Sequence, residues 1–260
     1  MSQREKKQSG FTLIELIIVI VLLGIVGAMG AGFISAAFKG FFDTDVRMEM
    51  YEEGKAAMVR MEREIHIAVP NAIQPFNNGS KANSGNEIQF GVIDENTMAT
   101  ASGQYLENEN NISGLPASRL ISIYNTQWCN FDLRSSPDCS ATDKSHIYTS
   151  DATGAIAVTA IDTLSPYQRY YVVHPSAVSF SVVGTTLSRS TAAVNVGAAL
   201  DAFGGAQTLA QNIIPSGALP YFTYNPGTST RNSVVSIHFA ISRNGETVNF
   251  HKEVQVRNVP

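Results

Sequence analysis

The 260-residue sequence predicts an α+β fold, in which one long N-terminal helix, transmembrane and then amphipathic, packs on a mostly antiparallel β-sheet domain. Three observations predict this fold. An almost wholly apolar run extends from Phe11 to Phe38, and an amphipathic helical pattern follows it over residues 39–69. From Pro70 onward, short strand-like runs alternate with polar loops, so residues 70–260 are expected to form the β-rich domain.

The first ten residues are polar and carry Arg4, Lys6 and Lys7 ahead of the apolar run. The run is longer than the roughly 20 residues with which a helix crosses a bilayer. Positive charge before such a segment holds the N-terminus in the cytoplasm and sends the following chain outward. Residues 1–10 are therefore predicted to be a cytoplasmic leader and residues 11–38 a transmembrane helix, which is too long for an ordinary cleaved signal peptide.

Glu15 is the one charged residue inside the apolar run. A carboxylate at this depth is costly, and an ionisable residue within a membrane segment is a functional hypothesis by default. The alternative is an edge residue whose side chain extends to the lipid headgroups. Both interpretations remain open from the residues alone.

Gly24, Ala28 and Gly32 recur every four positions along the same segment. This spacing places small side chains on one helical face, where a neighbouring helix can approach closely in lipid. The alternative is that glycine is simply common in membrane helices. The three residues are predicted to serve helix–helix assembly.

The amphipathic pattern beyond the membrane segment places one set of apolar residues on one face of the helix, namely Val46, Met50, Met58, Met61, Ile65 and Ala68. We expect this face to pack on the domain. The helix should end at Val69, because a proline disfavours helical geometry in the residue before it.

Six runs after Pro70 have the residue types of strands, and the last two are joined by a turn at residues 243–246, which predicts a C-terminal hairpin. The predicted strands are Glu87–Asp94, Arg119–Tyr124, Gln168–His174, Val178–Val183, Val234–Ile241 and Val248–Val256. Residues 191–212 are rich in Ala and Gly, and a weak helix or a mobile insertion is expected there.

Cys129 and Cys139 are the two cysteines, ten positions apart in a polar stretch. The pair fits a disulfide, half of a metal site, or two unpaired thiols. If the chain reaches an oxidising compartment, a disulfide is the better interpretation. A metal site is disfavoured, since His146 is the only further candidate ligand nearby.

Neither composition nor motifs indicate an enzyme. The net charge of −4 gives no support for a nucleic-acid partner. No cofactor motif or catalytic residue was found, and the histidines are scattered at positions without metal-ligand spacing in the sequence. They are His66, His146, His174, His238 and His251.

Two sets of loop residues suggest binding roles, each with a simpler alternative. Asp132, Asp138, Asp143 and Asp151 offer oxygen ligands for calcium, but solvated loop charges are favoured because the spacing of a dedicated loop is absent. Four aromatic residues suggest an exposed glycan-binding patch, with a buried core as the alternative. These are Tyr105, Tyr124, Trp128 and Phe131.

The segment Gly10-Phe11-Thr12-Leu13-Ile14-Glu15, followed by a long apolar helix, resembles the prepilin signature of type IV pilins and type II secretion pseudopilins. The resemblance implies that a prepilin peptidase cuts between Gly10 and Phe11 and that the new Phe11 amine is methylated. It further implies that Glu15 pairs with the amine of a neighbouring subunit. The implied partners are the peptidase, other major and minor pilins, the inner-membrane assembly platform and the lipid bilayer.

Shorter segments narrow this resemblance. Residues 58–65 are similar to the helix end of J-type pseudopilins, whereas residues 170–173, 178–180, 187–189 and 245–260 resemble MshO-type minor pilins of the mannose-sensitive haemagglutinin pilus system. This resemblance implies a minor pilin in the inner membrane with a periplasmic domain, later incorporated into the pilus fibre or priming its assembly. A J-like pseudopilin and a tip adhesin that binds surface glycans are the alternatives.

Overall fold

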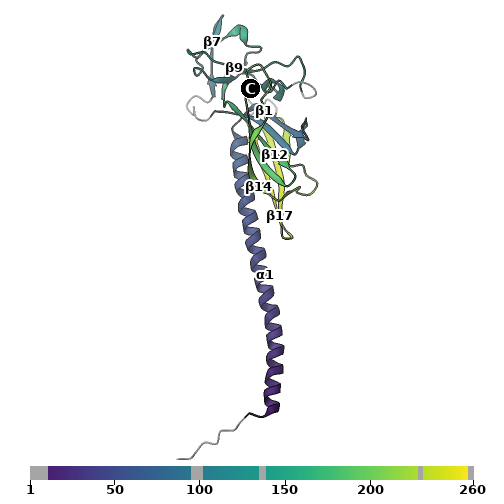
Figure 1. Ribbon diagram of the computed structural model, residues 1–260. Helices are drawn as coiled ribbons and strands as arrows, with labels where there is room; N and C mark the ends of the chain where they lie inside the picture. The colour runs from purple at the N-terminus through teal and green to yellow at the C-terminus, as the bar shows by residue number, and fades with distance from the viewer. Residues whose placement is uncertain (1–10, 95–101, 135–138, 228–230, 257–260) are drawn as a thin grey trace, which may run out of the picture. The chain divides into compact units, whose positions relative to one another are not determined.

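The computed structural model describes residues 11–94, 102–134, 139–227 and 231–256. It divides into two compact units, Met1–Met48 and Glu49–Pro260. Helix α1, Leu13–His66, contributes its first part to the N-terminal unit and its last turns to the C-terminal unit (Figure 1).

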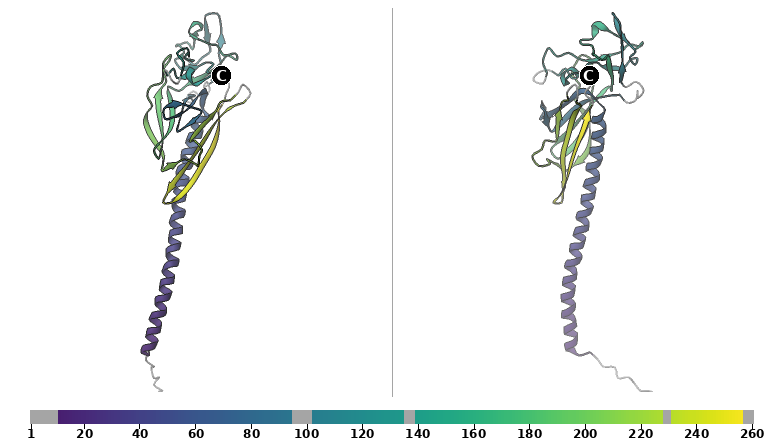
Figure 2. Two further views of the ribbon diagram at one scale, coloured as in Figure 1. Left: turned by 90° about the vertical axis from the view of Figure 1, so that its right-hand side faces the viewer. Right: turned by 180° about the vertical axis from the view of Figure 1, so that it is seen from behind.

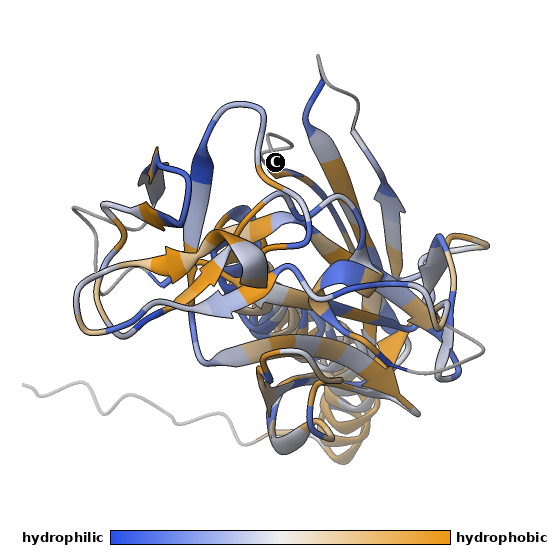
Figure 3. Ribbon diagram, turned by 90° about the horizontal axis from the view of Figure 1, so that it is seen from above, coloured by the Kyte–Doolittle hydropathy of each residue, from blue (hydrophilic) through white to orange (hydrophobic). Residues whose placement is uncertain are grey.

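In the N-terminal unit, α1 presents apolar side chains on all its sides. Leu13, Leu23 and Phe33 are 78%, 65% and 78% exposed. Figure 3 shows this hydrophobic character along the helix. A helix that is apolar all round requires an apolar environment, such as a membrane or a bundle of similar helices.

α1 ends at His66, and the prediction that it ends at Val69 is wrong by three residues. Strand β1, Ala68–Asn77, begins instead, and Ala68 pairs with Val92. Pro70 lies within this strand, at a register shift between Ala68 and Ile73. A bulge of this kind tolerates proline, which has no N–H to give to a strand ladder.

All strand pairs in the described segments are antiparallel, and the predicted fold class is confirmed. The first strands after β1 are β2 Ser80–Lys81, β3 Ser84–Gly85, β4 Glu87–Val92, β5 Ser102–Gln104, β6 Leu106–Glu107, β7 Asn111–Ser113, β8 Leu120–Ser122, β9 Ile147–Thr149 and β10 Ile156–Ala157. The later strands are β11 Arg169–Val173, β12 Ser176–Val183, β13 Thr186–Ala193, β14 Gly204–Gln211, β15 Ile213–Ile214, β16 Phe222–Asn225, β17 Ser233–Arg243 and β18 Glu246–Val256. Two short helical turns, α2 Trp128–Phe131 and η2 Val158–Ala160, lie between strands.

The largest sheet has six strands in the order β14-β13-β12-β4-β1-β2. Strands β12 and β13 pair without interruption from Ser176↔Ala193 to Val183↔Thr186. The predicted strands in this sheet, β4 and β12, are confirmed with shifts of no more than two residues at an end.

Two smaller sheets, β5-β11-β8-β9 and β10-β7-β6, form a second region of the C-terminal unit. Their core is apolar and aromatic, and it is built mainly by Tyr105, Ile112, Ile121, Ile123, Tyr170 and Val172. Predicted strands β8 and β11 are confirmed here, whereas β5, β6, β7, β9 and β10 were not predicted. Each of these strands is two or three residues long, which is too short to show an alternating pattern in the sequence.

The predicted C-terminal hairpin is confirmed as β17 and β18, paired from Ser233↔Val256 to Arg243↔Glu246. Asn244 and Gly245 occupy its turn with φ of 52° and 84°. A two-residue hairpin turn requires positive φ at both positions, and this pair of residues tolerates it. Figure 2 shows the hairpin alongside the last turns of α1.

Those last turns of α1 pack on the sheets through one buried face, which consists of Met50, Gly54, Ala57, Met58, Met61 and Ile65. Gly54 allows a close approach, because an added Cβ would overlap the Phe250 ring of β18. Across the interface, Lys252 of β18 pairs with Glu62 at 3.0 Å. The prediction that this helical face packs on the domain is confirmed for Met50, Met58, Met61 and Ile65, whereas Val46 belongs to the N-terminal unit and Ala68 to strand β1.

Residues 191–212 do not form the weak helix or mobile insertion predicted from their composition. β13 continues to Ala193, and β14 pairs with β13 from Gly204 onward. Two contacts with α1 hold β14: the Gln211 N–H donates to Glu53, and Arg60 donates to the Gln207 side chain at 3.0 Å. These partners are more than a hundred residues away, so local composition could not indicate the strand.

Candidate functional site

The start of α1 carries the residues predicted to be processed and used in assembly. The backbone N–H of Glu15 donates to the Thr12 carbonyl at 3.1 Å. The same nitrogen lies 3.4 Å from the Thr12 hydroxyl oxygen. Thr12 and Glu15 thus have the spacing of a capping box, in which a Thr and a Glu three residues later satisfy the first free N–H groups. The sequence shows this spacing, and its capping role was missed.

Glu15 is exposed, and its carboxylate lies in the first turn of the helix. A negative charge is favourable there, because the helix dipole places partial positive charge at the N-terminus. Phe11, one residue before Thr12, is 80% exposed. Gly10 lies outside the described residues, so the processing role of the Gly10–Phe11 bond stays a prediction.

Helix α1 is long and apolar enough to cross a membrane, with a mean hydropathy of 2.7 in its most apolar window. The side chains of that window are unburied in the chain by itself. Gly24, Ala28 and Gly32 are exposed, and no atom lies within 4 Å of a Cβ built on either glycine. The small-residue face is therefore open to a neighbouring helix, and its role in assembly stays a prediction.

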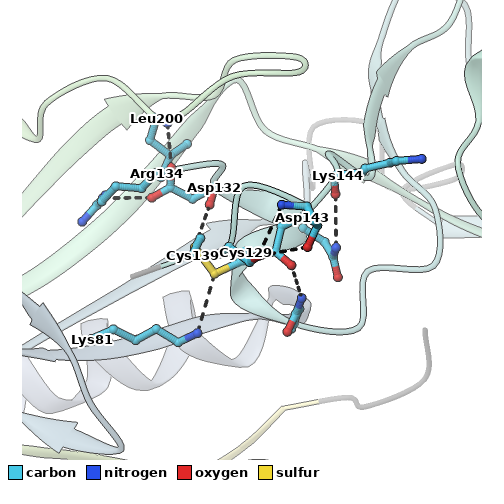
Figure 4. The surroundings of a disulfide bond; sticks show 12 residues. Lys81, Cys129, Asp132, Arg134, Cys139, Asp143, Lys144 and Leu200 are labelled. Carbon is cyan, nitrogen blue, oxygen red and sulfur yellow. Dashed lines mark hydrogen bonds and ion pairs between the residues drawn. A yellow bond between two sulfur atoms is a disulfide. The ribbon is translucent and has the colours of Figure 1, made fainter. Parts of the chain in front are cut away.

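Cys129 and Cys139 form a disulfide, with Cα atoms 5.5 Å apart (Figure 4). Cys129 belongs to the short turn α2, whose Trp128 and Phe131 rings pack near Phe76 of β1. The Lys81 ammonium lies 3.6 Å from the Cys129 sulfur. The bond therefore closes a polar loop over a buried aromatic cluster.

Asp132 is fully buried beside this disulfide and is held on both carboxylate oxygens. Arg134 pairs with Oδ2 at 2.9 Å, and the Leu200 N–H donates to Oδ1 at 3.0 Å (Figure 4). Leu200 lies between β13 and β14 in the sequence, so Asp132 connects the disulfide loop to the six-stranded sheet. Its role is structural.

The acidic residues considered for calcium have separate roles in the described parts of the chain. Asp143 accepts hydrogen bonds from the Ser140 N–H and the Gln127 amide. Asp151 accepts hydrogen bonds from Ala155 and Thr153, which lower the pKa of its carboxyl group. Asp138 lies outside the described residues.

Cys129, Cys139 and Asp143 lie close enough together to suggest a metal site, but their chemistry does not fit one. A carboxylate oxygen of Asp143 lies within 4.8 Å of both cysteine sulfurs. Those sulfurs are bonded to each other, however, and a metal requires the thiolate. In this loop the two cysteines form a disulfide, and Asp143 accepts a hydrogen bond within a neighbouring turn.

Of the two interpretations of the four aromatic residues, the exposed patch is wrong, and the buried core is confirmed for Tyr105, Trp128 and Phe131. Tyr105 and Phe131 are fully buried, Trp128 is 2% exposed, and Tyr124 is partly buried. The Tyr105 hydroxyl accepts the Ser165 N–H at 3.0 Å, and burial raises its pKa. These rings belong to two of the apolar clusters of the domain and are not available to bind a glycan.

Sequence reasoning missed one cluster of chemically capable side chains. His238 of β17 and His251 of β18 lie directly opposite each other, with ring centroids 4.4 Å apart. Thirteen positions separate them in the sequence, and the hairpin register brings them together. The predicted hairpin could have indicated this pair, since the position of its turn determines which residues lie opposite each other.

Comparison with known protein families gives one finding. Residues 6–31 match the prokaryotic N-terminal methylation motif, the type IV pilin signature. The match supports a pilin-like structural subunit and implies processing by a prepilin peptidase and assembly with other pilins. Neither the curated proteins nor the solved structures give a match to this chain.

Proposed function

We propose that the chain is a minor pilin of a type IV pilus, of the MshO type in the mannose-sensitive haemagglutinin pilus system. It acts as a subunit that is incorporated into the fibre or primes its assembly, and it performs no catalysis. The observation that carries the proposal is the methylation motif at residues 6–31 on a helix whose apolar surface is exposed on all sides. Such a surface requires a membrane or neighbouring helices.

Processing is proposed to begin with cleavage between Gly10 and Phe11 on the cytoplasmic side, followed by methylation of the Phe11 amine. The product carries a positive amine two residues before the first residue of α1. In a bundle of apolar helices this charge needs a partner, since an unpaired buried charge costs several kcal/mol. The exposed Glu15 carboxylate of an adjacent subunit supplies it, with an attraction of about 4 kcal/mol at 4 Å and an effective dielectric constant of 20.

The proposed location is the inner membrane, with residues 11–38 across the bilayer, α1 continuing beyond them to His66, and the β-rich domain that begins at β1 in the periplasm. Two observations support it: basic residues precede the apolar run, and the Cys129–Cys139 disulfide suits an oxidising compartment. The assembly platform and other major and minor pilins then draw the subunit into the fibre. Gly24, Ala28 and Gly32 are proposed to line the helix contacts within it.

The test is the intact mass and N-terminal sequence of the protein isolated from native membranes. The expected result is a chain that begins with N-methylated phenylalanine at Phe11. A Gly10→Ala variant is expected to retain the leader, because the residue before the cut must fit closely in the peptidase. A chain that still begins at Met1 in cells with active prepilin peptidase would overturn the proposal.

A J-like pseudopilin of type II secretion is a second candidate, favoured by the similarity of residues 58–65 to that group. Both candidate functions include cleavage by the prepilin peptidase, so the N-terminal sequence does not distinguish them. Deletion of the gene does. Loss of surface pili with normal protein secretion supports the pilus subunit. Loss of secretion with normal pili supports the pseudopilin and overturns the assignment to a pilus.

A further inference from the structure

The paired histidines of the C-terminal hairpin form a cluster that the pilin assignment does not use. His238 and His251 project from the face of the β17–β18 hairpin opposite to Lys252, which pairs with Glu62 of α1. Their rings are nearly parallel, with an interplanar angle of 11°. His251 is exposed and His238 is half-buried.

The His238 ring has one nitrogen with a partner and one without. Its Nδ1 atom is buried and has no hydrogen-bond partner. The Pro220 carbonyl hydrogen-bonds the same ring, so this bond belongs to Nε2, which carries the proton. The Nδ1 lone pair is therefore buried without a hydrogen-bond donor. A buried acceptor of this kind costs free energy unless a donor or a cation binds it.

This arrangement is the one that metal-binding histidines use. A histidine ligand commonly donates its second ring N–H to a backbone carbonyl, which fixes the tautomer and aims the free lone pair at the ion. Pro220 provides that carbonyl for His238. The backbone also holds the strand in place, since the His238 N–H donates to the Tyr221 carbonyl at 2.9 Å.

Glu253 lies on the same face as the two histidines and is the third candidate ligand, and its carboxylate has to turn toward the rings, since the ligand atoms of these three residues do not all lie within 4.8 Å of one another. It pairs with Ser236 across the hairpin, so it lies diagonal to His238 and two positions beyond His251. Long side chains at diagonal positions of an antiparallel pair reach each other. The Glu253 charge acts on the His238 ring, and Glu253 is exposed and free to turn toward it.

We propose that His238, His251 and Glu253 bind a divalent transition-metal ion, Zn²⁺, on the outer face of the β17–β18 hairpin. Two imidazoles and one carboxylate suit zinc, which binds such ligands at about 2.0–2.2 Å in tetrahedral geometry. His238 offers Nδ1, and exposed His251 rotates out of the stack to direct a ring nitrogen at the same ion. The fourth position faces solvent, where water or a side chain of another subunit fills it.

The charges around the cluster favour a cation. Glu253 is the charged group that acts on His238 from β18, and His251 is the other titratable group facing it. From the neighbouring segment at Pro220, Tyr221 contributes a phenol whose pKa is raised by burial, so it stays neutral. Lys252 points to the other face of the hairpin, where it forms an ion pair with Glu62.

The test uses the purified full-length protein in detergent micelles, titrated with Zn²⁺ after removal of metals with a chelator. The variants are His238→Ala, His251→Ala and Glu253→Gln, and His66→Ala is the matched control. His66 is also exposed and lies near β18, where its ring contacts the Gln255 carbonyl at 3.2 Å. Imidazole ¹⁵N chemical shifts, measured in parallel, identify the nitrogen that binds the ion.

The expected result is one Zn²⁺ per chain, with affinity reduced at least about tenfold in each histidine variant and less in Glu253→Gln. His66→Ala should bind like the unaltered protein, and the ¹⁵N shift of His238 should change at Nδ1. Because His251 is exposed, its variant is expected to fold, so its result does not depend on the stability of the core. Unchanged affinity in His251→Ala, or absence of stoichiometric binding, would overturn the proposal.

Discussion

Arg189 of β13 donates its Nε–H to both carboxylate oxygens of Glu64, with Nε–Oε2 and Nε–Oε1 distances of 2.7 and 3.1 Å. The side chains are 20% and 12% exposed. Glu64 belongs to the last turns of α1, so the bond joins the helix to β13, the second strand from one edge of the six-stranded sheet. Arg60 also donates to Glu64, at 3.1 Å, from a more exposed position.

Replacement of Arg189 with Ala should lower the free energy of unfolding of the domain by about 2 kcal/mol. The reason is that a largely buried carboxylate loses a charge-assisted hydrogen bond, although Arg60 still balances part of its charge. Urea denaturation of the full-length protein measures the change. Arg60→Ala is the control and should cost less than about 1 kcal/mol, because its exposed ion pair is screened by solvent. Equal losses in the two variants would contradict the importance of the Arg189 contact.

Gly54→Ala should lower the free energy of unfolding by about 1–3 kcal/mol, the usual cost of overpacking a core. The added Cβ overlaps the Phe250 ring, which packs flat near Tyr51 and Phe239. A double-mutant cycle with Phe250→Leu checks the cause. The loss from Gly54→Ala should shrink when the ring is absent, and strictly additive losses would show that the contact is not responsible.

Reduction of the Cys129–Cys139 disulfide should lower the stability of the domain by about 2–3 kcal/mol, the loop-closure entropy of a ten-residue loop. Thermal unfolding with and without a reductant measures the change. The paired variant Cys129→Ala/Cys139→Ala is the control and should be insensitive to the reductant. A fall of the same size in that variant would assign the effect to the reductant.

The stability of the domain should fall as the pH drops below about 6.5. Burial, followed by the nearby His251 charge, lowers the pKa of His238 from its ordinary value of 6.5. The unfolded chain therefore takes up this proton at a higher pH than the folded chain, and protonation favours unfolding between 6.5 and the lowered pKa. Melting temperatures measured with a chelator should show a smaller decline in His238→Asn, and an identical decline would contradict the assignment.

Glu15→Gln should abolish incorporation of the subunit into pili while it leaves membrane insertion and leader cleavage intact. An amide keeps the size of the side chain but cannot balance a buried positive amine. Immunoblots of sheared pili and of membranes measure the two steps separately. Ile14→Leu is the matched control and should assemble normally. Normal assembly of the Glu15→Gln variant would contradict the proposed pairing between Glu15 and the Phe11 amine.

Local patterns predicted the elements that depend on neighbouring residues. The apolar run, the hairpin turn at Asn244–Gly245 and the helical face that includes Met58 and Met61 are all confirmed. The end of α1 was misplaced because Ala68 pairs with Val92, a partner that the sequence around Pro70 does not indicate. β14 was missed because Glu53 and Arg60 of α1 hold it.

The sequence by itself determined the methylation motif, the apolar helix and the α+β class, because each depends on composition or on a short repeat along the chain. Only the tertiary structure decided which side chains meet. It buried Tyr105 and Phe131 inside cores, and it placed His238 against His251. The physical reason is that burial and cross-strand pairing depend on contacts between distant segments, which hydrophobic periodicity does not specify.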